Sequence, residues 1–240
     1  MAATTAGARL TEAHRVAQAR LGAQSVRALR STLLLLNPDA LDATIERFLS
    51  AAVPIVTGQR ATSARLAAGY LEAFKKLELG SDAVLRAVLA DMIPAEQVVT
   101  SLTVTGPVSI KRAMTRGVSL AKAAETAEVN VARAGMRLVL GGGRDTITET
   151  TRADRQAAGW ARATSGRPCA FCAMIAGRGG VFSEQSAAFE AHDGCSCTAE
   201  PVFREDAALP AGSDRWARLW AEADATDGDT VKNFQALVAA

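Results

Sequence analysis

The stretch SLAKAAETAEVNVARAGMRLVLGGG, residues 119–143, points to a helical fold because alanine, valine and charged residues follow one another there as in a long helix. The pattern predicts that this helix ends or kinks after Leu140, since Gly141–Gly143 favour a break. A phosphate-binding loop of the GxxxxGK type is excluded, because both its lysine and its preceding strand are missing. One more helix is expected from Asp145 to Ala163, with Trp160 near its end.

The residues that precede this stretch predict further helices. Asn37 followed by Pro38 is typical of a helix N-cap with proline in the first turn. Pro54 and Gly58 are expected to interrupt that helix, and the following one is expected to end near Gly80. Apolar residues recur on one face of each helix, at Leu41, Ile45, Phe48, Leu49, Ala52 and Val53, and at Leu66, Tyr70, Phe74 and Leu77. We expect these faces to form the core.

Two shorter helices are predicted in the middle of the chain. Ser81 and Asp82 are typical caps for a helix over residues 84–89, which Pro94 would stop. The segment TGPVSIKRAM, residues 105–114, has proline where the first turn of a helix accepts it. The N-terminal part of the chain is therefore expected to be helical throughout.

Beyond Gly166 the composition changes to glycine, cysteine and short β-prone pieces, GGVF at residues 179–182 and TAEPVF at residues 198–203. The chain then returns to helix, where Trp216 and Trp220 lie one turn apart. The predicted fold is mainly α, with three parts: a helical domain over residues 1–163, a small α+β Cys/His module over residues 164–204, and an acidic helical tail over residues 205–240.

The composition predicts a cytoplasmic protein without a membrane partner. The chain has 240 residues, of which 49% are apolar and 22% charged, and it contains no apolar run of membrane-spanning length. Its first residues lack the apolar core of a secretion signal. Thiols normally stay reduced in the cytoplasm.

The net charge of +2 hides an uneven distribution. Residues 108–180 hold 12 basic and 5 acidic side chains, whereas residues 181–240 hold 4 basic and 11 acidic ones. We expect the basic segment to pair with the acidic tail or with a partner protein. Nucleic acid is the alternative, but no aromatic residues alternate with the basic ones as a single-strand binding surface requires.

Five candidate metal ligands lie close together in the sequence. Cys169 and Cys172 form a CxxC pair, and after 19 residues the chain continues with His192, Cys195 and Cys197 as HxxCxC. A CxxC turn can direct two thiolates at one ion, and zinc is the ion that thiolate and imidazole ligands favour. A structural zinc would stabilise a short module with few large apolar residues. The pattern offers five ligands for four tetrahedral positions and does not select among them.

Three other interpretations of the cysteines stay open: reduced buried thiols, one or two disulfides, and a redox CxxC pair. The redox interpretation is weak, because no thioredoxin-like βαβ pattern precedes Cys169. The sequence offers two imidazole bases for catalysis, His14 and His192, and His14 is expected on an exposed helix face as a solvated surface residue. A pair of His192 with Cys195, next to Asp193, is the candidate for nucleophilic chemistry, but a ligand role explains the surrounding cysteines better. No GxSxG or HExxH motif is present.

Residues 155–203 resemble the C-terminal part of the MuF-like minor head proteins of tailed bacteriophages, in the form found in phages of actinobacteria. In place of the HPxCxC pattern of that family, this chain has His192-Asp193-Gly194-Cys195-Ser196-Cys197, which keeps the ligands and leaves the turn geometry open. The elements that carry the resemblance are Trp160, Arg167-Pro168, Cys169, Cys172, Arg178-Gly179-Gly180, His192, Cys195, Cys197 and Pro201-Val202.

The resemblance implies a structural role in the phage head. Members of that family are minor capsid or head-morphogenesis proteins that are thought to bind the portal protein and to be packaged inside the procapsid. The chain would then be assembled in the host cytoplasm and end in the virion, in the capsid interior near the portal. Further expected partners are scaffold or major capsid protein, packaged DNA facing the basic span from Lys111 to Arg178, and other copies of the chain. The alternative that the resemblance implies is a capsid maturation protease.

Overall fold

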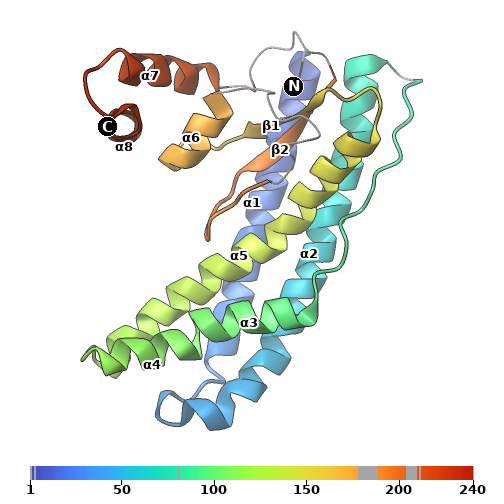
Figure 1. Cartoon of the computed structure of the whole chain (residues 1–240). Helices are drawn as coiled ribbons and strands as arrows, with labels where there is room; N and C mark the ends of the chain where they lie inside the picture. The colour runs from blue at the N-terminus through green and yellow to red at the C-terminus, as the bar shows by residue number, and fades with distance from the viewer. Residues whose placement is uncertain are drawn as a thin grey trace.

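Three long helices form the body of the protein: α1 (Thr5–Leu33), α2 (Leu41–Leu79) and α5 (Leu120–Ala153). They lie side by side in the computed structural model (Figure 1), which describes residues 2, 4–80, 82–177, 189–203, 210 and 212–239. Their buried faces meet in a core that includes Leu29, Phe48, Val56, Leu71, Val131 and Val139. The prediction of a mainly α fold with a Cys/His cluster towards the C-terminus is confirmed.

The predicted break at Gly141–Gly143 is wrong, because α5 continues through these glycines to Ala153. The glycines are sites of close helix contact rather than of chain reversal. A Cβ on Gly142 would lie 2.3 Å from the backbone oxygen of Arg60 on α2, and one on Gly143 would lie 2.6 Å from the amide nitrogen of Gln18 on α1. Here the absence of side chains lets the three helices approach one another.

The predicted interruption at Pro54 and Gly58 is also wrong, since both residues lie inside α2. Both are exposed, whereas Ala52 and Val56 beside them are fully buried. Water can satisfy the backbone carbonyl that Pro54 leaves without a partner, while burial of the opposite face holds the helix together. The predicted start and end of this region are confirmed: Asn37 caps the short 3-10 helix η1 (Pro38–Ala40), and α2 ends before Gly80, which has a φ of 107°.

Residues 82–94 are extended, so the helix predicted there is wrong; its proposed cap Ser81 lies outside the described residues. The segment connects the end of α2 to the start of α3 (Ala95–Thr105) and runs alongside the bundle (Figure 1). An extended chain covers more than twice the distance per residue of a helix. The backbone N–H of Val88 donates to Thr150 Oγ1 of α5, at 2.9 Å, and that of Ala90 donates to Thr146 Oγ1, at 3.0 Å; these two bonds take the place of helical ones.

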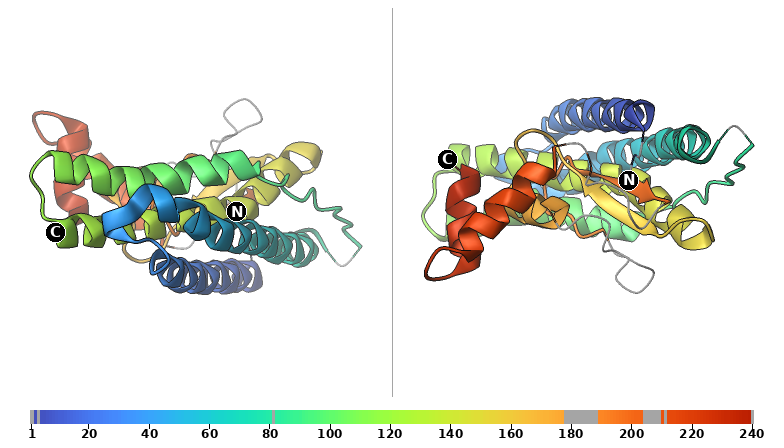
Figure 2. Two further views of the ribbon diagram at one scale, coloured as in Figure 1. Left: turned by 90° about the horizontal axis from the view of Figure 1, so that it is seen from below. Right: turned by 90° about the horizontal axis from the view of Figure 1, so that it is seen from above.

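The helix predicted within TGPVSIKRAM, residues 105–114, is confirmed, since α4 (Pro107–Thr115) begins at the proline of this segment. Figure 2 shows α1 on one side of α2 and α5, and the α3–α4 pair on the other. Two further helices follow near the C-terminus, α7 (Asp214–Asp224) and α8 (Thr230–Ala239), and pack against α6 (Ala170–Gly177) through Trp216 and Phe234. Among the described residues, no helix combines the length and apolarity needed to cross a bilayer.

A two-stranded antiparallel sheet lies against α5 and carries the Cys/His region. Strand β1 (Gly159–Ala163) pairs with β2 (Thr198–Val202), with Ala161 opposite Glu200. The strand at TAEPVF is confirmed, whereas Trp160 lies on β1 and not on the helix predicted to reach Ala163. The segments GGVF and Arg178-Gly179-Gly180 lie outside the described residues. The division into residues 1–163, 164–204 and 205–240 stays a prediction.

Candidate metal centre

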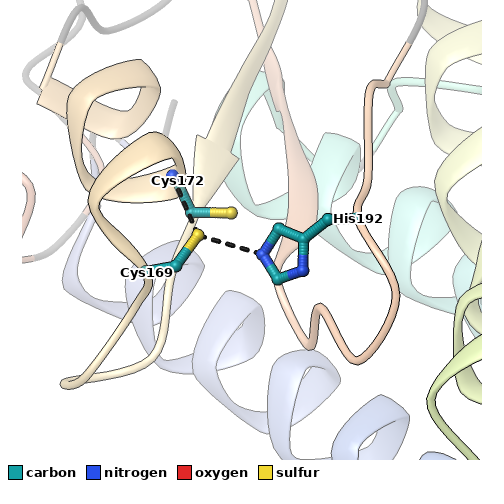
Figure 3. A group of neighbouring side chains, drawn as sticks. All are labelled: Cys169, Cys172 and His192. Atoms are coloured by element: carbon teal, nitrogen blue, oxygen red, sulfur yellow. Dashed lines mark hydrogen bonds between the residues drawn. The ribbon is translucent and has the colours of Figure 1, made fainter. Parts of the chain in front are cut away.

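The structure brings the five predicted ligands together from two segments of the chain. Cys169 and Cys172 come from the start of α6, and Figure 3 shows them facing His192 of the loop that leads into β2. Cys195 and Cys197 come from the same loop. They form two groups of three, Cys169–Cys172–His192 and Cys172–Cys195–Cys197, and within each group the ligand atoms lie within 4.8 Å of one another. Cys172 belongs to both groups, so these residues could hold a metal ion.

The CxxC spacing acts through the first turn of α6. The carbonyl of Cys169 accepts the N–H of Ala173, at 2.9 Å, which makes Cys169 the N-cap of the helix. Its Sγ lies 3.4 Å from the N–H of Cys172, as an N-cap oxygen would. The first turn therefore directs both sulfur atoms to the same side, toward the loop that carries the second cluster.

Contacts across the two segments complete the cluster. Cys169 Sγ lies 3.0 Å from His192 Nε2, and Cys172 Sγ lies 3.6 Å from Cys195 Sγ. Cys172, Cys195 and Cys197 are 1–4% exposed, while Cys169 and His192 face solvent. All four cysteines are free thiols in this structure. The cluster thus has a buried half made of sulfur and an accessible half that contains the imidazole.

The orientation of His192 suits a ligand. Its Nδ1 lies 2.9 Å from the carbonyl oxygen of Asp193, which can only accept, so Nδ1 carries the proton. In the neutral ring, the lone pair of Nε2 then points toward Cys169. Histidines that bind metals commonly donate their other ring N–H to a carbonyl or carboxylate in this way.

The turn in which Asp193 replaces the proline of the MuF-like pattern is well fixed. Gly194 adopts a φ of 82°, a conformation that glycine accepts without strain, and its N–H donates to the carbonyl of Arg133 at 3.0 Å. The carboxylate of Asp193 accepts from Arg137 Nε at 2.6 Å. These two bonds attach the ligand loop to α5 and answer the question that the sequence left open.

The sulfur atoms share protons, as closely spaced thiols must. The hydrogen bond from Cys172 lowers the pKa of Cys195, and the same bond raises the pKa of Cys172, which keeps its proton. Burial opposes the ionisation of Cys169, but the hydrogen bond from the Cys172 N–H and the contact with His192 in its cationic form outweigh it and lower the pKa of Cys169. The bond to Asp193 raises the pKa of His192. For Cys197, the bond to Cys172 lowers the pKa, but the bond to Cys195 and burial outweigh it and raise the pKa to about 12. Negative charge is therefore favoured on Cys169 and Cys195, the state that binds a cation, whereas Cys172 and Cys197 hold their protons more tightly than a free thiol.

Two arginines around this cluster were missed by the sequence analysis. Arg144 of α5 and Arg162 of β1 are 2% and 1% exposed, and both contact the cysteine segments. No motif marks them, because they come from elements whose positions beside the cysteines depend on tertiary contacts. Their burial is unusual for arginine and indicates a local source of negative charge.

The expectation for His14 was wrong. Its side chain is 5% exposed and stacks on Tyr70 of α2, with 4.4 Å between the ring centroids. Burial lowers its pKa to about 4. His14 therefore belongs to the interface between α1 and α2, and among the described residues it lies apart from the cysteine cluster.

Comparison with known proteins identifies a family over most of the chain. A family model described as VG15 protein matches residues 4–223. No curated protein and no solved structure matches the chain.

Proposed function

Because the chain belongs to the VG15 family of phage proteins, we propose that it is a structural minor capsid protein of a tailed phage. In this proposal it binds the portal protein and is packaged inside the procapsid, and its Cys/His cluster holds a structural zinc ion. The observation that carries the structural role is the burial of Cys172, Cys195 and Cys197, which are 1–4% exposed and out of reach of a protein substrate. The resemblance of residues 155–203 to MuF-like proteins supports the place in the phage head.

Zinc fits the donor set better than other common metals. Thiolate and imidazole ligands in a tetrahedral arrangement select zinc, whereas magnesium and calcium prefer oxygen. The ion would tie the first turn of α6 to the loop before β2, two segments that 19 residues of sequence separate between Cys172 and His192. Binding energy at such a site becomes folding energy for the residues around it.

The metal is tested by elemental analysis of protein purified without added zinc. We expect about one zinc per chain, lost in Cys172→Ser, because Cys172 lies in both groups of ligands. Ser196→Ala is the matched control, since Ser196 lies between Cys195 and Cys197 and supplies no ligand. Wild-type protein without stoichiometric metal would exclude the zinc site.

The place in the head is tested by co-expression with the portal protein and by mass spectrometry of purified virions. We expect the chain to co-purify with portal rings and to be present in virions. Salt-dependent binding to duplex DNA by the isolated protein tests contact with packaged DNA, and light scattering tests association between copies. A chain absent from both procapsids and virions would contradict the structural role.

One contact favours the alternative of a capsid maturation protease. Cys169 and His192, with 3.0 Å between Sγ and Nε2, have the spacing of a thiol nucleophile and its base, and both face solvent. Co-expression with scaffold or major capsid protein separates the two functions. We expect no cleavage; cleavage by the wild type that disappears in Cys169→Ser and in His192→Ala, but persists in Ser196→Ala, would replace the structural role by an enzymatic one.

A further inference from the structure

Two buried guanidinium groups lie beside the cysteine cluster and have no acidic partner in the part of the chain that the structure describes. No ion pair of Arg144 or Arg162 with a carboxylate is present among the described residues, although both side chains are almost fully buried. Moreover, Arg144 Nη1 and Arg162 Nε have no hydrogen-bond partner there. A buried and unpaired charge costs several kcal/mol, about 3–5 where one partner of a buried pair is removed. Among the described residues, the groups beside these arginines that can carry a negative charge are the cysteine sulfur atoms.

Arg144 holds the loop that supplies the second half of the cluster. Its Nε donates to the carbonyl oxygen of Cys197 at 2.9 Å, and its Nη2 donates to that of Cys195 at 2.6 Å. One planar side chain thus fixes two alternate ligand residues of the loop from the middle of α5. The two carbonyls accept hydrogen bonds but carry no net charge, so they do not neutralise the guanidinium.

Arg162 of β1 reaches the sulfur of Cys172 directly. Its Nη1 lies 3.5 Å from Cys172 Sγ, and its Nη2 donates to the carbonyl of Glu190 at 2.7 Å. The guanidinium carbon lies 3.9 Å from the ring centroid of Phe189, and that of Arg144 lies 5.1 Å from the same ring. The two cations are thus stacked against one aromatic residue next to the cysteines, where their mutual repulsion adds to the cost of burial.

A metal ion bound by several thiolates would supply negative charge next to these arginines, because the net charge of such a centre is negative. Zinc with three thiolates and a histidine carries a net charge of −1, and zinc with four thiolates carries −2. The sulfur half of either centre would be buried next to two guanidinium groups, for which the described residues offer no carboxylate partner. Donors aimed at ligand sulfur and at ligand carbonyls are the contacts by which outer residues orient a metal site.

We propose that Arg144 and Arg162 are the counter-charges and positioning residues of the metal–thiolate centre. This inference rests on the zinc site of the proposed function. It also accounts for part of the basic excess of residues 108–180: two of its 12 basic residues are directed inward, to the cysteines, rather than outward to a partner.

The test compares Arg162→Lys with Arg162→Gln, two variants that lose similar packing and differ in charge. Arg20→Gln, on an exposed position of α1, is the control for charge loss elsewhere. Zinc affinity is measured by competition with a chromophoric chelator, and thermal unfolding is followed with zinc and after chelation. We expect zinc binding about 10–100-fold weaker in Arg162→Gln, a smaller loss in Arg162→Lys, and no change in Arg20→Gln.

The same experiment separates failure of the inference from failure of the metal site. If wild type binds zinc and the Lys and Gln variants bind it equally well, the counter-charge role is excluded while the zinc site stands. If Arg162→Gln loses the same thermal stability with zinc and after chelation, Arg162 stabilises the fold by packing alone and the counter-charge role is excluded. If wild type binds no zinc, the metal site itself is excluded, and the inference with it. If the Arg162 variants fail to fold, the same comparison of zinc affinity and thermal unfolding is made with Arg144→Lys and Arg144→Gln.

Discussion

Replacing Gly142 by alanine tests the continuity of α5 and its close contact with α2. In a helix interior this substitution normally stabilises by about 0.5–1 kcal/mol, because glycine loses more backbone freedom on folding. At Gly142, however, the new Cβ would lie 2.3 Å from the backbone oxygen of Arg60 and 2.9 Å from its Cγ. Ordinary contact needs 3.4 Å, so the two helices must separate by about 1.1 Å.

Such a separation weakens the packing of a core that extends along both helices. A radial gap of about 0.5–1 Å already removes a quarter to a half of each dispersion contact, and overpacking of cores typically costs about 1–3 kcal/mol. Arg60 also donates to the carbonyl of Leu138 and pairs with Asp145, at 3.1 and 2.6 Å, and a shift of its backbone strains both bonds. We therefore expect Gly142→Ala to lower the free energy of unfolding by about 1–2 kcal/mol.

The assay is urea and thermal unfolding followed by circular dichroism, with Gly58→Ala as the control. Gly58 lies in α2, and no atom lies within 4 Å of the position of its Cβ, so alanine there should stabilise by about 0.5–1 kcal/mol. The two variants should shift the melting temperature in opposite directions, Gly142→Ala downward by about 2–8 °C. If Gly142→Ala is as stable as Gly58→Ala, the close approach of α2 and α5 is refuted.

Three further perturbations probe the interior. Burial lowers the pKa of His14 to about 4 from 6.5, so the stability that depends on a neutral His14 is complete above pH 6.5 and is lost as the pH falls toward 4. In urea titrations, His14→Gln should remove about 3 kcal/mol of this loss at acidic pH. An unchanged pH profile of stability would contradict this prediction. Lys75→Met leaves the partly buried Asp154, 2.6 Å from Lys75 Nζ, without its cation, which should cost about 3 kcal/mol, with most of it restored by adding Asp154→Leu. Equal instability of the double variant would argue against the pair. Thr150→Val removes the hydroxyl that accepts the Val88 N–H, so amide hydrogen exchange should become faster in residues 82–94 while α1 stays protected. Unchanged exchange rates would show that other contacts hold this segment in place.

Sequence patterns predicted the helices well where a buried face repeats over several turns. Most of the apolar positions predicted for α2, among them Phe48, Ala52, Tyr70 and Phe74, do lie on the face that packs into the core, whereas Leu66 and Leu77 are 38% and 44% exposed, so the prediction is wrong for these two. The same local rules failed at Pro54 and at Gly141–Gly143, because local propensity is worth about 1–3 kcal/mol per residue and a long packed face outweighs it. They failed again at residues 82–94, where threonine side chains of α5 accept backbone N–H groups of the segment, as at Val88 and Ala90.

For the candidate metal centre too, the sequence predicted which residues take part but not how they are arranged. Spacing alone was enough to select Cys169, Cys172, His192, Cys195 and Cys197, because ligand chemistry restricts which residues can surround one ion. Spacing did not reveal that Cys172 joins two groups, or that His192 contacts Cys169 rather than Cys195. These depend on how α6 is placed against the loop before β2.

By itself, then, the sequence determined the helical class, the core faces and the set of possible ligands, since each follows from residue type and periodicity over a short range. Only the tertiary structure decided that glycines mark helix contacts, that His14 is buried and that Arg144 and Arg162 face the cysteines. The physical reason is that burial and charge pairing depend on neighbours brought from distant parts of the chain, and the energies of those contacts exceed local preferences.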